Sequence, residues 1–186
     1  MKKRWKWSII SLSKKILFVM VEKNNMCTFL ERKLTLRLRH MAVAFLINEK
    51  NEIVFLKKKE DHHMLPGYFV PVGGHMEKDE MNEPLKACLR EINEEAGLTS
   101  DDITEIRIKY ILHRILDDEI RIQYVFVAKV KNGAVLVESD EGKLYWKSLE
   151  EIMFSKITKP VKEAVRHYFE EGHKTDEIYV LSFNED

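Results

Sequence analysis

A cluster of acidic residues in the middle of the chain constrains its fold more than any other feature. The segment from Arg90 to Leu98 reads Arg-Glu-Ile-Asn-Glu-Glu-Ala-Gly-Leu. In a helix, Glu91, Glu94 and Glu95 fall at positions i, i+3 and i+4, so the three carboxylates share one flank. Like charges at that spacing repel one another by a few tenths of a kcal/mol per pair. Such a cluster is either a solvated helix face or a place where a cation is bound.

The residues around the cluster predict a helix that is buried on one side. Apolar side chains recur at helical spacing and form one stripe, away from the glutamates. The stripe consists of Leu85, Cys88, Leu89, Ile92 and Ala96. Pro84 suits the first helical turn, with Asn82 or Glu83 as the N-cap, and Gly97 suits the left-handed C-terminal position. The preceding run 70–74 predicts a strand that ends in a flexible double-glycine turn.

The segment resembles the signature of the Nudix hydrolases, the MutT-type pyrophosphohydrolases. That signature is a glycine, five residues, a glutamate, seven residues and then Arg-Glu-aliphatic-x-Glu-Glu-x-Gly-aliphatic. Gly74 and Glu80 have the family spacing, and residues 90–98 agree at every specified position. Nine residues instead of seven separate Glu80 from Arg90, which indicates two extra residues in the loop before the helix. By helix register Asn82 takes the place of the first glutamate, whereas by glycine spacing Glu80 keeps it.

The resemblance implies an enzyme that binds Mg²⁺, or Mn²⁺ in its place, and acts on phosphorus-containing acid anhydrides. Mg²⁺ takes oxygen ligands and commonly binds through carboxylates and substrate phosphates. The implied metal ligands are Glu91, Glu94, Glu95, Glu80 and the carbonyl group of Gly74. The implied catalytic residues are Glu91, as a further ligand or to orient the water, and Arg90, which holds a glutamate by charge-assisted hydrogen bonds. For the first acid we favour Glu80 over Glu77 and Glu83.

Further candidates for substrate contact lie outside the predicted helix. Gly73 lets the backbone approach the metal or the phosphates. Lys57 and Lys58 end a predicted strand and are candidates for phosphate contact, although a solvated lysine run is the simpler interpretation. Some family members use another acid from a distant loop; Glu141 is the candidate here, with Glu138 as the alternative, and an exposed acid is the simpler interpretation of each.

The composition fits an enzyme domain rather than a nucleic-acid-binding protein. A chain of 186 residues can bury a substantial core, and its formal net charge is zero, so no global charge attracts nucleic acid. The two cysteines, Cys27 and Cys88, have no zinc-ligand spacing, and Cys88 is expected to be a small buried hydrophobe. We expect a cytoplasmic protein whose partner is a small-molecule nucleotide substrate and not a nucleic acid.

Residues 1–37 are predicted to be a basic and apolar N-terminal extension of the hydrolase domain, residues 38–186. The first 21 residues carry six lysine or arginine residues and no acid. Lys14-Lys15 interrupts the apolar stretch, which argues against a signal peptide, and neither apolar run can span a membrane. An extra strand or helix packed on the domain is the favoured interpretation. The alternatives are a basic interfacial helix, through which residues 1–21 would contact a membrane, and a segment that partly precedes the biological start.

The remaining pattern predicts an α/β fold. Hairpins are expected around residues 49–51 and at Asp117-Asp118, and strands flank the helices, which argues for an α/β sandwich with a mixed sheet. The resemblance likewise implies the Nudix α/β/α sandwich. Strands are expected over residues 39–48, 52–58, 68–72, 106–112, 120–128, 144–146 and 178–183, and helices over residues 84–96, 148–153 and 159–171.

The sequence specifies the substrate only by elimination. About sixteen residues past the signature there is neither the proline associated with ADP-ribose hydrolases nor the tyrosine associated with diadenosine polyphosphate hydrolases. We therefore expect a nucleoside or deoxynucleoside triphosphate, cleaved to monophosphate and pyrophosphate. The alternative is a non-catalytic Nudix-fold sensor of a nucleotide ligand, although such proteins often lose the carboxylates that this helix keeps.

Overall fold

The computed structural model describes residues 6–12, 15–21, 27–32, 37–116 and 118–184. The chain divides into two compact units, residues 1–37 and 38–186. In the first unit, β1 (Lys6–Leu12), β2 (Lys15–Val21) and β3 (Cys27–Arg32) form an antiparallel sheet in the order β1-β2-β3. The described part of the extension is therefore strand and not the interfacial helix considered as an alternative. Among the described residues, no helix is both long and apolar enough to cross a membrane.

The second unit is built on a mixed sheet that has seven strands in the described residues, in the order β10-β7-β8-β4-β6-β5-β9. Its strands are β4 (Arg37–Ile47), β5 (Ile53–Lys58), β6 (Phe69–His75), β7 (Ile103–Leu116), β8 (Glu119–Val130), β9 (Gly142–Lys147) and β10 (Tyr179–Asn184). Strand β10 runs parallel to β7, whereas β7 and β8 are antiparallel, as are β6 and its neighbours β4 and β5. All the strands expected in this unit are present.

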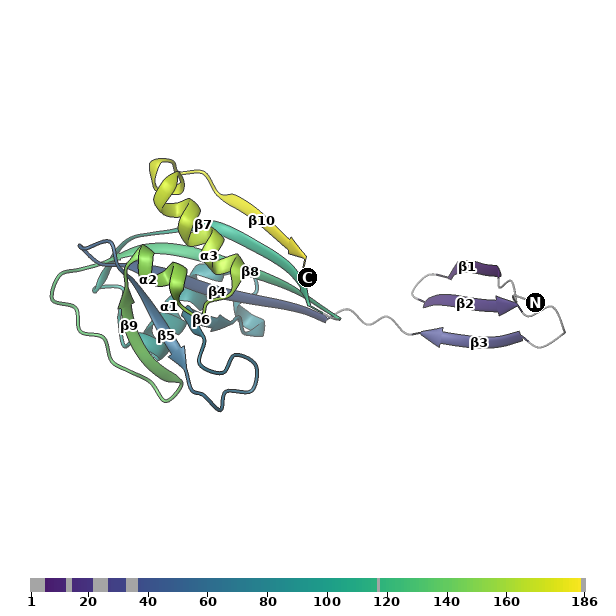
Figure 1. Cartoon of the computed structure of the whole chain (residues 1–186). Helices are drawn as coiled ribbons and strands as arrows, with labels where there is room; N and C mark the ends of the chain where they lie inside the picture. Colours follow the sequence, from purple (N-terminus) through teal and green to yellow (C-terminus); the bar gives the residue numbers. More distant parts are fainter. Residues whose placement is uncertain (1–5, 13–14, 22–26, 33–36, 117, 185–186) are drawn as a thin grey trace. The chain divides into compact units, whose positions relative to one another are not determined.

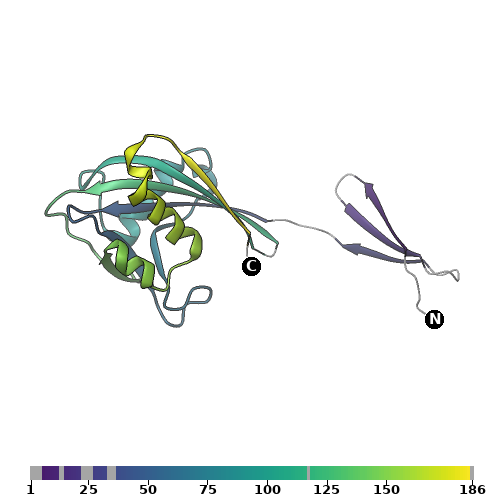
Figure 2. The same cartoon turned by 45° about the horizontal axis from the view of Figure 1, so that its top comes forward.

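Helices cover both faces of this sheet. α1 (Pro84–Ala96) lies on one face, and α2 (Leu149–Phe154) and α3 (Lys159–Glu170) lie on the other (Figure 1, Figure 2). Two 3-10 turns, η1 (Lys78–Glu80) and η2 (Gly172–Lys174), precede α1 and follow α3. The predicted α/β sandwich with a mixed sheet is confirmed.

Alternation along β4 explains why there are two cores. Successive side chains of a strand point to opposite faces. Ala44 and Leu46 belong to the apolar cluster that packs with α1, whereas Val43 and Phe45 belong to the cluster under α2 and α3. β4 is therefore buried on both sides, which makes it a rigid support for its neighbour β6.

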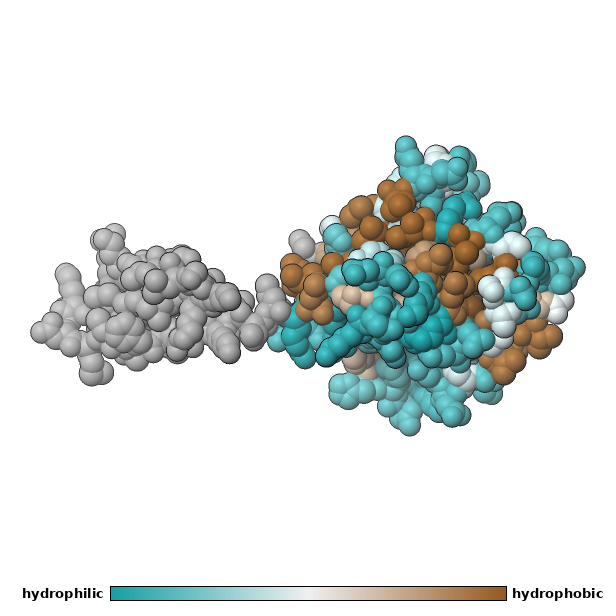
Figure 3. All heavy atoms as spheres, turned by 180° about the vertical axis from the view of Figure 1, so that it is seen from behind, coloured by the Kyte–Doolittle hydropathy of each residue, from teal (hydrophilic) through white to brown (hydrophobic). Residues whose placement is uncertain are grey.

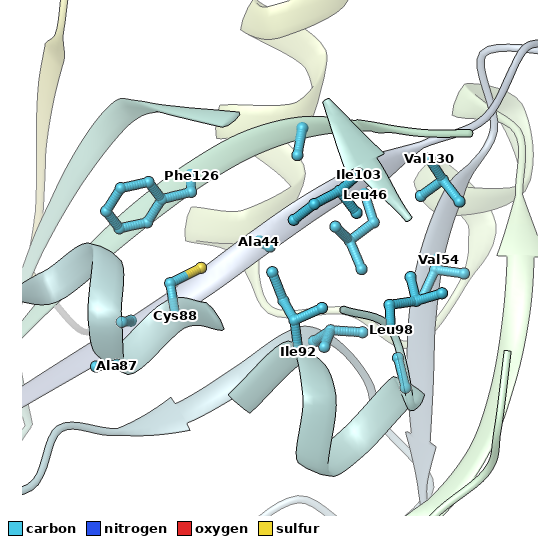
Figure 4. Packing of buried hydrophobic residues seen from close by; sticks show 14 of the residues in the cluster. Ala44, Leu46, Val54, Ala87, Cys88, Ile92, Leu98, Ile103, Phe126 and Val130 are labelled. Carbon is cyan, nitrogen blue, oxygen red and sulfur yellow. The ribbon is translucent and has the colours of Figure 1, made fainter. Parts of the chain in front are cut away.

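Local signals predicted the ends of α1 correctly. The helix begins at Pro84 with Glu83 as its N-cap, and it ends before Gly97, which adopts a left-handed φ of 68°. Figure 4 shows Cys88 and Ile92 pointing into the cluster beneath the helix. Burial raises the pKa of the Cys88 thiol to about 12, so this cysteine is the inert buried residue that was predicted.

Leu85 departs from the predicted apolar stripe. It is 41% exposed and lines an apolar hollow with Leu89, Ile108 and Phe126. Apolar side chains remain visible on the surface of the molecule seen from behind in Figure 3. The apolar pattern gives the side of the helix on which Leu85 lies, but it does not tell how closely the sheet packs against the first turn.

Candidate active site

The two glycines of β6 each allow a neighbouring element to approach closely. The predicted turn at this place is wrong, because β6 continues through Gly73 and Gly74 to His75 and pairs with β4. Gly73 has a φ of 136°, and a Cβ there would collide with the backbone of Ala42. A Cβ on Gly74 would lie 2.6 Å from Oε2 of Glu91. Gly73 therefore serves the close packing of β6 against β4, whereas Gly74 makes room for the Glu91 carboxylate of α1 against the backbone of β6.

Glu95 is the more deeply buried of the two acids that α1 turns toward β6. Its side chain is 4% exposed, and the backbone N–H of Gly73 donates to its Oε2 at 2.7 Å. Lys58 Nζ, at the end of β5, lies 3.5 Å from Glu95 Oε1 and also pairs with Glu141 in the loop before β9. Burial raises the pKa of Glu95 to about 7, whereas the hydrogen bond from Lys58 lowers the pKa of Glu141. Three segments distant in sequence therefore meet at one lysine.

Arg90 collects the remaining acids. Its Nε and Nη2 donate to Glu80 at 2.9 and 3.0 Å, and its Nη1 lies 2.7 Å from Glu94 and 3.0 Å from Glu91. Nη2 also donates to the carbonyl oxygen of His75 at 3.1 Å. The hydrogen bonds with Glu80 raise the pKa of Arg90, so the guanidinium stays charged. Arg90 thus fixes acids and backbone together; its role in turnover stays a prediction.

Glu80, rather than Asn82, lies beside Arg90. Both Glu80 oxygens accept from Arg90, and the backbone N–H of Glu77 also donates to Oε2 at 3.0 Å. The hydrogen bonds from Arg90 hold the pKa of Glu80 at about 2. Asn82, Glu77 and Glu83 are exposed, so the two extra residues are absorbed before the helix starts. This geometry makes Glu80 an anchor for the arginine and does not favour its predicted place among the metal ligands.

Most of the predicted site residues line one cleft of about 500 Å³. The predicted residues in its wall are Gly73, Gly74, Arg90, Glu91, Glu95, Lys58 and Glu141. Glu80 and Glu94 lie beside the cleft, bound to Arg90. Lys57 does not line the cleft; it follows the strand alternation to the other side of β5 and pairs with Glu60 at 3.4 Å, which corrects its predicted phosphate contact. A second hollow of about 700 Å³, near Asn48 and Tyr168, contains none of the predicted residues.

Sequence reasoning missed a basic part of the same cleft. Arg39, Arg121 and Gln123, from β4 and β8, line it. Arg39 Nη1 lies 3.0 Å from Nε2 of His75, and burial together with Arg39 lowers the pKa of His75. Strand alternation places Arg121 and Gln123 on one face, but no local signal says that β8 lies next to β4.

The acids of the site fit a hard divalent cation in their chemistry. Among the residues that the structure describes, no three acidic, histidine or cysteine side chains are gathered as a ready metal site, since Arg90 and Lys58 hold the acids. The donors are nevertheless all oxygens. Burial raises the pKa values of Glu91 and Glu95, so that a cation in place of a proton would relieve their desolvation. The residues therefore fit Mg²⁺, with the cation replacing Arg90 and Lys58 as the partner of the acids.

The fold is that of a class of enzymes that act on phosphate anhydrides. The chain belongs to the NUDIX domain family, whose model matches residues 37–168. It is a hydrolase that acts on phosphorus-containing acid anhydrides, and the family acts on small nucleotide-type substrates, generally with divalent metals such as Mg²⁺.

Solved structures share this fold at low sequence identity. A MutT protein from Methanosarcina mazei Go1 has a TM-score of 0.62 and 24% identity, covering 74% of this chain and 97% of that one. A NUDIX hydrolase from Nitrosomonas europaea has a TM-score of 0.65 and 17% identity, covering 97% and 94%. A C. elegans Ap4A hydrolase has a TM-score of 0.61 and 20% identity, covering 70% and 95%. Among curated proteins, none matches the chain.

Proposed function

We propose that the protein is a Mg²⁺-dependent pyrophosphohydrolase of the MutT type, which cleaves nucleoside or deoxynucleoside triphosphates to monophosphate and pyrophosphate. One observation carries this proposal: Glu91 and Glu95 are buried acids in the wall of a cleft, against the backbone of β6. Burying a carboxylate is costly unless something compensates it. A cation bound in the cleft beside substrate phosphates would compensate the burial of these two acids, whereas core packing would not.

Each residue of the site has its own role in the proposed reaction. Glu94 and Glu95 would hold the cation, and Glu91 would orient the attacking water and accept its proton, since burial raises the pKa of Glu91. Bound Mg²⁺ would neutralise phosphate charge and lower the pKa of water. Arg90 keeps the acids in place through its hydrogen bonds, and Lys58 faces the cleft as a positive charge for phosphate oxygens.

The choice of a triphosphate rests on the missing sequence markers of other subclasses. Similar structures named MutT, from Methanosarcina mazei and Bacillus halodurans, are in keeping with it. The similar C. elegans structure is an Ap4A hydrolase, so dinucleoside polyphosphates belong in any substrate panel.

A product-resolved hydrolysis screen tests the proposal. The full chain is incubated with Mg²⁺ and a panel of nucleoside triphosphates, nucleotide sugars and dinucleoside polyphosphates, and products are separated by ion-exchange chromatography. Monophosphate and pyrophosphate are expected from triphosphates, with turnover lost in Glu95→Gln and kept in Glu150→Gln, an exposed acid of α2. No hydrolysis of any panel member, or equal turnover in Glu95→Gln, would overturn the proposal.

A further inference from the structure

The basic part of the cleft is built from a buried ion cluster. Arg39 Nε lies 2.8 Å from Glu119 Oε1, and Arg121 Nε donates to Glu119 Oε2 at 2.9 Å. The side chains of Glu119 and Arg121 are 6% and 10% exposed, and that of Arg39 is 33% exposed. The cluster is therefore no solvated surface pair, and Arg39 is its most accessible member.

This cluster carries an excess of positive charge. Among the described residues, Glu119 is the only acid in contact with Arg39 or Arg121, so one carboxylate faces two guanidiniums. An anion in the cleft would balance the remaining charge.

Stability alone is a poor reason for such an arrangement. Replacing a buried ion cluster by well-packed apolar residues is often neutral or stabilising. A guanidinium, by contrast, presents a fork of donors that matches a carboxylate or phosphate. Arg39, Arg121 and the amide of Gln123 line the cleft together, and each can donate to an oxyanion.

The cluster lies next to the acids of α1 through His75. Arg39 Nη1 contacts the His75 ring at 3.0 Å, and Arg90 Nη2 donates to the His75 carbonyl at 3.1 Å. His75 directly follows Gly74, whose missing side chain makes room for Glu91. One bound molecule can therefore reach both the acids and the arginines within the cleft.

We propose that Arg39 and Arg121, with Gln123, form a subsite for a second oxyanion, carried by the substrate outside the diphosphate that is cleaved. This inference rests on the proposed function and refines its substrate class: preferred substrates have a carboxylate or an additional phosphate on the group attached to the diphosphate. An uncharged group at that position leaves the two guanidiniums under-compensated.

Matched pairs of diphosphates test the subsite. UDP-glucuronate and UDP-glucose differ by a carboxylate, whereas NADPH and NADH, or coenzyme A and dephospho-coenzyme A, differ by a phosphate. Dissociation constants are measured by calorimetry without added metal, and kcat/KM is measured with Mg²⁺, both on the full chain. At least one pair should show a preference of about tenfold or more for its anionic member, which corresponds to about 1.4 kcal/mol.

Substitutions of Arg39 test whether it binds the oxyanion or only stabilises the fold. Arg39→Gln should remove most of the preference, Arg39→Lys should keep part of it, and Arg166→Gln, on the exposed face of α3, should keep all of it. If Arg39→Gln unfolds, which circular dichroism would show, Arg39→Lys and the wild-type ratios still decide.

The outcomes distinguish this inference from the proposed function. Turnover without any preference would overturn the subsite and leave the hydrolase standing. A binding preference without turnover of these compounds, and without turnover of triphosphates in the hydrolysis screen, would leave the subsite standing and overturn the hydrolase. Neither binding nor turnover of any pair would overturn the subsite, whereas the hydrolase would still stand if triphosphates were turned over in the hydrolysis screen.

Discussion

Replacing Glu80 by glutamine should lower the free energy of unfolding by about 2 kcal/mol at pH 7 in metal-free buffer. The folded-state pKa of Glu80 is about 2, against an ordinary value of 4.5. That difference corresponds to about 3 kcal/mol, and the 26% exposure of Arg90 reduces it to about 2 kcal/mol by solvent screening. Because the folded pKa is depressed, this stabilisation is present above about pH 4.5 and is lost as the pH falls toward 2.

Urea unfolding followed by circular dichroism measures the loss. The difference between wild type and Glu80→Gln should be largest at pH 7 and should shrink at pH 3. Glu83→Gln is the matched control, because Glu83 is exposed and its side chain makes no capping hydrogen bond, so its effect should stay within about 0.5 kcal/mol. An equally small effect of Glu80→Gln at pH 7 would refute the role of Glu80 as the anchor of Arg90.

Three further substitutions, one of them with a matched control, test the cleft. Glu95→Gln should lower kcat by about 100-fold or more, while urea unfolding without metal shows equal or higher stability because a buried charge is removed. Gly74→Ala should reduce turnover, measured by product release, because its Cβ would displace the Glu91 carboxylate; wild-type kcat would contradict this. Lys58→Met should lower kcat/KM whereas Lys57→Met should not, and equal effects in the two variants would show that the strand alternation has been misjudged.

Features that depend on neighbouring residues could be predicted from the sequence. The start of α1 at Pro84 and its end at Gly97 depend on backbone preferences of single residues, and the acids of the helix follow from its period. The double glycine was misread, because glycine serves both turns and close approaches. Only the folded structure shows that the Glu91 carboxylate lies so close to Gly74 that a side chain there would collide with it.

Features that depend on the order of strands could not be predicted. Arg39 and Arg121 lie 82 positions apart in the sequence, yet Glu119 joins them across β4 and β8. Likewise, the sequence offers Glu141 and Glu138 as candidates for a distant acid, and only the structure shows that Glu141 pairs with Lys58. Lys57 and Lys58 lie on opposite sides of β5, and which of them faces the cleft depends on which face of the sheet α1 covers.

Mn²⁺ titration of wild type and Glu95→Gln, with turnover measured on the same samples, tests the central claim most directly. We expect wild type to bind Mn²⁺, to lose turnover in excess EDTA and to regain it with Mg²⁺ or Mn²⁺. Glu95→Gln should bind Mn²⁺ at least about tenfold more weakly and show no restored turnover, whereas Glu150→Gln should behave as wild type. Full turnover of wild type in excess EDTA, or unchanged Mn²⁺ affinity in Glu95→Gln, would contradict the assignment of the α1 acids as a metal site for hydrolysis.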